Sequence, residues 1–157
     1  MKRFLVSLLG FALAGCHTAA PQAITSERAR FYLESTEGAT EVLTLPRSGV
    51  QISVMPKPVF SEYDLTTVDL AEAELGKCLA FQFTPAAARD LAKLTAANPG
   101  RRLVLVMGGV AFGARRIERP LDHGTLFIFV EVPDSALPAL VASLRETCAK
   151  LQTGMAK

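Results

Sequence analysis

The strongest constraint on the fold is the order of patterns between residues 77 and 151. A strand pattern at 77–84 is followed by a helix pattern from 85, then by three strand patterns and a second helix pattern. Short turns join the later strands, so these strands are expected to pair antiparallel. Because helices and strands segregate in this way, the sequence predicts an α+β fold, with a mostly antiparallel sheet and two helices packed on one face.

Both helix patterns carry signals for their ends. Thr84 and Pro85 predict the start of the first helix, because threonine accepts hydrogen bonds from free amides and proline needs no donor in the first turn. Pro99 disfavours helix at the residue before it and so ends this helix. Asp134 or Ser135 caps the second helix. Its apolar stripe recurs at helical spacing and comprises Leu137, Leu140, Val141, Leu144, Cys148 and Leu151.

The strand patterns differ in burial. Residues 77–84 alternate, which predicts one buried face made up of Leu79, Phe81 and Phe83. Residues 102–107 are almost wholly apolar, as expected for a central strand or one covered on both faces. The glycine pair 108–109 predicts a hairpin turn to the next strand, and residues 125–132 predict a further strand.

The region before residue 77 is less regular. We predict strands at 29–35, 41–45 and 50–55. Residues 55–60, MPKPVF, contain two prolines without amide donors, which favours an edge or an extended arm. We hypothesise that this arm receives an extended peptide by strand addition. Residues 64–74 fit either a strand with a turn or a short helix.

The first residues carry an export signal. The apolar run Phe4–Ala14 has 11 residues, which is too short for a bilayer span of about 20 but fits a signal peptide. Residues 13–16, Leu-Ala-Gly-Cys, resemble the bacterial lipobox. This resemblance implies cleavage between Gly15 and Cys16, a diacylglyceryl group on the Cys16 sulfur and acylation of the new amino group. The alternative is an ordinary secretory peptide that is cut further along.

His17 follows the lipobox cysteine, where inner-membrane lipoproteins of enteric bacteria carry aspartate. By this resemblance the outer membrane is favoured, with the chain facing the periplasm. We therefore predict a signal peptide at 1–15, a lipid anchor and tether at 16–28, a single domain at 29–152 and a disordered tail at 153–157. The membrane contact is then made through the N-terminal lipid.

The charge of the mature chain argues against a nucleic-acid partner. The whole chain has 17 basic and 15 acidic residues, a net charge of +2. Cleavage before Cys16 removes Lys2 and Arg3, which leaves 15 residues of each sign. Polyanion binders normally carry a marked excess of basic residues. We expect no nucleic acid among the partners.

Two cysteines remain after lipidation. An even number of thiols in an oxidising compartment is compatible with a disulfide. Alternation, however, turns Cys78 away from the buried face of its strand, whereas Cys148 lies on the apolar stripe of the last helix. A Cys78–Cys148 disulfide and two separate half-buried thiols are both compatible with the sequence.

Residues 77–145 carry a longer pattern. A strand leads into a capped helix, an exit with asparagine and glycine, an apolar strand, a glycine turn and a final strand. This pattern resembles the head of the first periplasmic domain of SecD, an accessory subunit of the protein translocase. The matching positions are Phe83, Thr84, Ala88, Leu91, Thr95, Asn98, Gly100, Leu103, Val104, Gly109, Ile117, Gly124 and Ile128.

The resemblance implies a SecD head-like fold and a role in holding a polypeptide outside the membrane. Two departures limit it. Arg115 and Arg116 stand where the family tends to have a proline before its x-Ile pair. SecD also has six membrane spans, whereas this chain has a lipid signal, so we expect no coupling to a transmembrane potential.

Residues for catalysis or metal binding are scarce. His123 lies in a predicted turn and is interpreted as solvent-facing. It shares no local ligand pair with Cys78 or Cys148, as a zinc site would require, and the glycines at 108–113 do not match a dinucleotide-binding motif. We expect no catalytic residue, no metal and no cofactor. Acidic residues such as Glu72 keep a small hydrolase as a remote alternative.

One polar cluster stands out, formed by Arg115, Arg116 and Arg119. It fits a docking surface for acidic groups, or a charged edge that discourages strand pairing. Our first hypothesis is therefore a lipid-anchored, non-catalytic binding module that contacts exported polypeptides or an envelope complex. The alternative is an assembly lipoprotein of the envelope with one fixed partner. The sequence leaves the oligomeric state undetermined.

Overall fold

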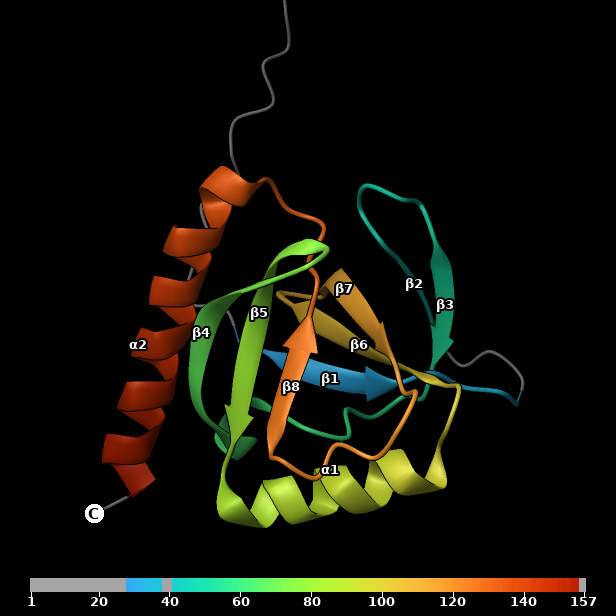
Figure 1. Cartoon of the computed structure of the whole chain (residues 1–157), viewed down its shortest axis with the longest axis horizontal. Coiled ribbons are helices and arrows are strands. Elements are labelled where there is room, and N and C mark those ends of the chain that lie inside the picture. The colour runs from blue at the N-terminus through green and yellow to red at the C-terminus, as the bar shows by residue number, and fades with distance from the viewer. Residues whose placement is uncertain (1–27, 38–40, 156–157) are drawn as a thin grey trace, which may run out of the picture.

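A computed structural model describes residues 28–37 and 41–155 (Figure 1). The helices are α1 (Pro85–Ala97) and α2 (Leu137–Met155), with short 3-10 turns at η1 (Glu62–Asp64) and η2 (Asp134–Ala136). The strands are β1 (Arg30–Leu33), β2 (Glu41–Thr44), β3 (Gln51–Val54), β4 (Leu65–Ala73), β5 (Gly76–Phe83), β6 (Arg102–Met107), β7 (Val110–Arg116) and β8 (Thr125–Ile128).

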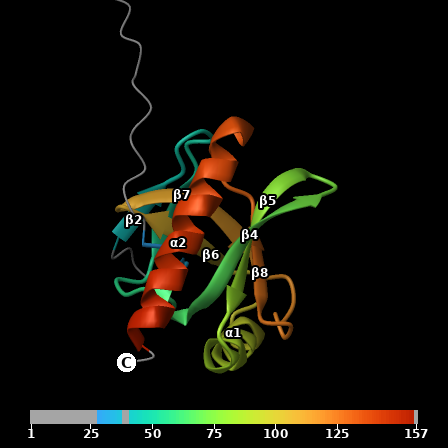
Figure 2. The same ribbon diagram turned by 90° about the vertical axis from the view of Figure 1, so that its left-hand side faces the viewer.

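The strands form three antiparallel groups, in the orders β1-β6-β7, β2-β3 and β4-β5-β8. The predicted order of elements from 77 to 151 is confirmed, and so is the α+β class with antiparallel sheets and two helices. The ambiguous segment at 64–74 is mostly strand, because β4 pairs along nearly its whole length with β5. Figure 2 shows the far end of this hairpin reaching out beyond the body of the domain.

The predicted strand at 125–132 is wrong in its second half. β8 ends at Ile128, and the chain then passes from one sheet to the other. Val130 forms an antiparallel bridge with Gly113 of β7, and the Glu131 amide donates to the Phe112 carbonyl over 2.7 Å. This crossing joins the two three-stranded sheets along the order β4-β5-β8-β7-β6-β1.

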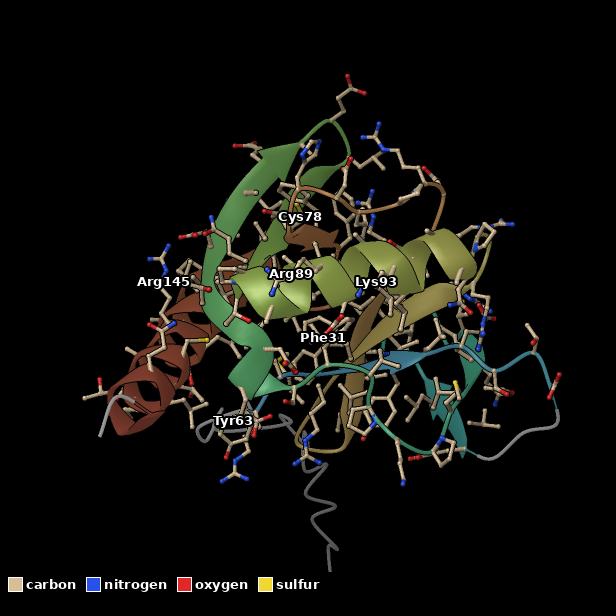
Figure 3. The ribbon with its side chains drawn as sticks, turned by 90° about the horizontal axis from the view of Figure 1, so that it is seen from below. Phe31, Tyr63, Cys78, Arg89, Lys93 and Arg145 are labelled. Carbon is tan, nitrogen blue, oxygen red and sulfur yellow. The ribbon has the colours of Figure 1, made fainter. Side chains whose placement is uncertain are left out.

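The main core lies inside this bent sheet. Phe31 of β1 contacts Phe81 and Phe83 of β5, with ring centroids 5.0 and 5.6 Å apart. The predicted buried face of β5 is therefore confirmed. Both helices contribute to the same core, with α1 across one end of the strands and α2 alongside β4 (Figure 1). Figure 3 shows Arg89 and Lys93 on the outer face of α1.

A smaller core explains why β6 is apolar on both faces. The β2–β3 hairpin covers the outer face of the β1-β6-β7 sheet with Leu43 and Ile52. These side chains pack with Val104 and Val106 of β6, whereas Leu103 and Leu105 belong to the main core. Both faces of β6 are thus covered, as its composition predicts.

The start of α1 follows its capping signal, whereas the start of α2 differs from the prediction. Asp134 and Ser135, predicted to cap α2, instead form the 3-10 turn η2, which leads into α2 at Leu137. The Ala87 amide donates to Thr84 Oγ1 over 3.3 Å at the start of α1. α2 continues to Met155, so the tail predicted at 153–157 is helical through its first three residues. Gln152 Nε2 donates to the Thr66 carbonyl over 2.7 Å and ties this last turn to β4. Arg145 of α2, labelled in Figure 3, donates to the Val68 carbonyl over 2.8 Å and to the Asp69 carboxylate.

The proline arm lies along the edge of β1. The Met55 amide donates to the Leu33 carbonyl over 2.9 Å, and the Val59 amide donates to the Phe31 carbonyl over 2.7 Å. The arm itself thus extends this edge, and its two prolines have no amide to offer a further strand.

Candidate functional site

One opening between secondary-structure elements lies where β7 and β8 part. A hollow of about 370 Å³ is lined there by the end of β7, the connecting loop and the edge of β8. We call it the β7–β8 hollow and define it by Arg115, Arg119, Leu121, His123, Thr125 and Phe127.

The hollow exists because the two strands diverge from a common point. They pair at Gly113 and Val130. β7 then runs to the C-terminal end of α1, where Ile117 exchanges backbone hydrogen bonds with Gly100 and Arg101. β8 starts at the other end of α1, where Gly124 lies against Ala88. The ten residues of helix between these points span about 15 Å at 1.5 Å each.

The connecting loop is fixed to α1 by a buried threonine. Thr95 Oγ1 donates to the Leu91 carbonyl over 2.7 Å and accepts from the Leu121 amide over 2.9 Å. Thr95 is only 1% exposed, so this bond is shielded from water. The wall of the hollow therefore has a defined position.

Two arginines give the hollow its charge. Arg115 Nη1 donates to the Phe127 carbonyl over 3.3 Å, and Arg119 is exposed at the rim. Asp122 is the acidic residue of the lining, and its Oδ1 lies 3.5 Å from His123 Nε2. The lining therefore holds two arginines against one aspartate, a formal excess of one positive charge.

The β8 edge contributes backbone groups. The Phe83 amide donates to the Gly124 carbonyl, which fixes the alternation of bonds along the β5–β8 pair. By this alternation the amides and carbonyls of Thr125 and Phe127 point away from β5, toward the hollow. No further strand pairs with β8 there in the described part of the chain. Phe127 is 42% exposed, so the same edge also presents an apolar ring.

The structure divides the arginine cluster predicted from the sequence. Arg115 and Arg119 line the hollow, whereas Arg116 does not. Arg116 pairs in register with Arg102, and its Nη2 lies near Gly100. Phe127 was not singled out from the sequence, although it alternates with the buried Leu126 and Ile128 and so had to face outward.

The two remaining cysteines are free thiols, so the Cys78–Cys148 disulfide is not formed in this structure. Cys148 belongs to the main core. Cys78 lies on the opposite face of β5 from the core residues Leu79 and Phe81. Both thiols are fully buried, not half-buried as predicted. Burial raises the pKa of both, although the charge of Arg115 lowers that of Cys78 in part.

Glu62 is a buried carboxylate that the sequence analysis did not identify. It is 3% exposed. Its Oε1 lies 3.6 Å from Arg28 Nε and its Oε2 lies 3.9 Å from Arg30 Nε. These contacts tie the start of β1 to η1, and none of the three residues lines the β7–β8 hollow.

Other predicted features concern residues that the structure does not describe or groups that it does not bring together. Gly15 and Cys16 lie outside the described residues. Within residues 28–37 and 41–155, no three His, Cys, Asp or Glu side chains gather as metal ligands would. In the same residues, neither helix has the length and apolar character needed to cross a membrane.

Comparison with known proteins shows similarity at the level of fold. No protein-family model matches the chain, and no curated protein matches it in sequence. Solved structures of SecDF do match. One, described as a membrane component that enhances protein export, is 19% identical with a TM-score of 0.59, over 78% of this chain and 61% of that one.

A second structure, SecDF in its super-membrane-facing form, is 18% identical with a TM-score of 0.60, over 80% of this chain and 19% of the other. A third, the translocon-associated SecDF of Thermus thermophilus, is 20% identical with a TM-score of 0.52, over 78% and 20%. The chain therefore spans about three fifths of one of these chains and one fifth of the others. The SecD-like fold predicted from the sequence is confirmed.

Proposed function

We propose that the chain is a lipid-anchored, non-catalytic binding module of the cell envelope. It faces the periplasm and contacts exported polypeptides or an envelope complex through the β7–β8 hollow. The observation that carries this proposal is the composition of the hollow. An open strand edge, two arginines and a half-exposed phenylalanine meet at one place.

These groups suit a polypeptide ligand. A free strand edge offers main-chain hydrogen bonds to an extended segment. Arginine binds carboxylates, and an exposed aromatic ring contributes apolar contact area. The shared fold with SecDF, one structure of which is described as enhancing protein export, supports a polypeptide partner over a small-molecule one.

The contact is tested by photo-crosslinking in cells that express the full chain. A photoreactive phenylalanine derivative replaces His123, whose side chain is 92% exposed at the rim. This position leaves both arginines in place. The matched control carries the same group at Arg116, which is exposed near the end of the same strand as Arg115 but does not line the hollow.

We expect adducts at position 123 with several exported chains or a translocase component, and far fewer at position 116. A single recurrent envelope protein at position 123 would instead support the assembly lipoprotein with one fixed partner. Equal labelling at the two positions, or none at 123, would contradict the hollow as the contact surface.

The anchor is tested separately through Cys16. Replacement by serine removes the sulfur that the lipobox resemblance implies is acylated, so we expect the protein to leave the membrane fraction and to lose incorporated fatty acid. At least two acyl chains are needed for stable anchoring. Membrane association that is unchanged in Cys16→Ser, or wild-type protein without fatty acid, would contradict the anchor.

A further inference from the structure

We propose that the β7–β8 hollow receives the free carboxyl end of a polypeptide. Its terminal carboxylate lies beside Arg115 and Arg119, and its last residues extend along β8. This inference rests on the proposed function and specifies the part of the polypeptide that is recognised.

The hollow has a wall at each of its two ends. At its narrow end the space is closed by the pairing of Gly113 with Val130. At its wide end it is closed by loop residues 119–123, which Thr95 holds against α1. An extended chain that ran along β8 would meet one of these walls in either direction. A chain that enters from the solvent side and follows β8 therefore reaches a wall, and a free end fits this space without a turn back into solvent.

The hollow is wide enough at one end for one added strand. β7 and β8 are neighbours at the narrow end and reach opposite ends of α1, whose intervening ten residues span about 15 Å. Neighbouring strands lie about 4.8 Å apart, so one added strand needs about 10 Å between the two that flank it. A wedge that opens to this extent has room for one added strand toward its wide end, beside Thr125 and Phe127.

The outer edge of β8 directs backbone groups into the hollow. Thr125 and Phe127 direct their amides and carbonyls into the hollow, and no other strand of the described chain pairs with them. The Phe127 carbonyl already accepts from Arg115. Arg115 is thus held over the edge, where its remaining guanidinium donors face the space that a ligand would occupy.

The side chains that line the hollow carry more positive than negative charge. Arg115 and Arg119 outweigh the one acidic side chain, Asp122, which lies beside His123. A carboxylate is a group that a guanidinium binds well in a protein, through paired charge-assisted hydrogen bonds. A chain that ends in the hollow places its own carboxylate there, which satisfies the shape and the charge together.

An apolar surface lies beside the charged one. Phe127 is 42% exposed, and Leu121 is half-buried in the loop opposite. The last or second-last side chain of an extended ligand would lie over this surface. We therefore expect free carboxyl ends with apolar final residues to bind better than those with polar final residues.

The test measures the binding of fluorescein-labelled peptides to the full chain in detergent by fluorescence anisotropy. The first peptide, Thr-Val-Thr-Val-Thr-Leu, has a free carboxyl end. The second has the same sequence with an amidated end. The third is amidated but ends in aspartate, so that a side-chain carboxylate is offered in place of the terminal one.

We expect the free-acid peptide to bind about tenfold more tightly than the amidated one, because a hydrogen bond to a charged group contributes about that factor. Arg119→Gln should remove most of this preference. Arg116→Gln, an equally exposed arginine outside the hollow, should leave it unchanged. Because Arg119 is at the rim, its replacement leaves the buried contacts of the fold intact.

Equal affinity of the first two peptides would overturn the inference. So would an effect of Arg116→Gln as large as that of Arg119→Gln, stronger binding of the aspartate peptide than of the free acid, or no binding of any peptide. The proposed function fails separately, when position 123 yields no adducts in cells. Adducts at that position without a preference for free carboxyl ends would keep the proposed function and reject this inference alone.

Discussion

The carbonyl oxygen of Phe129 lies 2.2 Å from the point where a Cβ atom on Gly113 would stand. β7 and the chain leaving β8 can meet this closely only because Gly113 has no side chain. The same place holds the Gly113–Val130 bridge, so this contact joins the two sheets and fixes the narrow end of the β7–β8 hollow.

Gly113→Ala should therefore be strongly destabilising. The added methyl group meets backbone rather than a flexible side chain, so the strands have to separate, and we expect a loss of about 3 kcal/mol in the free energy of unfolding. Urea denaturation measures it. Gly154→Ala is the control, because its added Cβ meets nothing within 4 Å and the helix should gain slightly. Equal stability of the two variants would contradict this role of Gly113.

Thr95→Val tests how the loop wall is held. Valine has the shape of threonine but leaves the Leu121 amide without its acceptor, which should cost about 1–3 kcal/mol. We expect faster hydrogen exchange at Leu121 in addition to the lower stability. Thr95→Ser keeps the hydroxyl and should keep the protection of that amide. Protection that is equal in the valine and serine variants would show that another group holds the loop.

Glu34 and Arg102 predict a dependence of stability on pH. Arg102 Nη2 lies 2.5 Å from Glu34 Oε1, and its hydrogen bonds lower the pKa of Glu34 although burial opposes them. A lowered pKa contributes stability above the unfolded pKa of about 4.3 and loses it as the pH falls through the folded pKa. We expect the free energy of unfolding to fall steadily below about pH 4.3.

Glu34→Gln should reduce this fall in the free energy of unfolding at acid pH and should lower stability at neutral pH. Glu74→Gln, at the exposed tip of the β4–β5 hairpin, is the matched control and should leave the acid dependence of the free energy of unfolding unchanged. Chemical denaturation at a series of pH values compares them. If the free energy of unfolding of Glu34→Gln falls as steeply at acid pH as that of the wild type, the pH dependence belongs to other carboxylates.

Glu131 should hold the β2–β3 hairpin onto the domain. Its Oε2 accepts from the amides of Arg47 and Ser48 over 2.8 and 2.9 Å. Desolvation raises the pKa of Glu131, but the bonds from Ser48 and Arg47 outweigh it and lower the pKa overall. In Glu131→Ala we expect hydrogen exchange in the hairpin to accelerate about tenfold, while α1 and α2 keep their protection. Uniform acceleration over the whole chain would contradict a local role.

The sequence predicted most of the fold because its signals are local. Thr84 caps α1 as expected, and the Gly108–Gly109 turn has the positive φ angles of 57° and 81° that only glycine adopts readily. Several positions in the SecD resemblance have structural roles here. Thr95 binds the loop and Gly124 lies against Ala88. Residues of this kind predict a fold rather than an activity.

The hollow was only half predicted because it depends on contacts between distant segments. The alternation of side chains along β7 predicts on which face of the strand Arg115 lies. The place where β8 leaves its sheet, however, is set by the approach of Phe129 to Gly113. The sequence has no local signal for this crossing. It therefore grouped Arg116 with Arg115 and Arg119 and did not bring Phe127 to them.

The central claim is that the β7–β8 hollow is the binding surface of this protein, and amide NMR shifts test it most directly. The full chain in detergent is titrated with the free-acid peptide Thr-Val-Thr-Val-Thr-Leu while the backbone amides are followed. We predict the largest shifts at Leu121, His123, Thr125 and Phe127, with none in the β2–β3 hairpin. Shifts centred on the proline arm at 55–60 or on the β4–β5 hairpin, with the hollow unchanged, would contradict the claim.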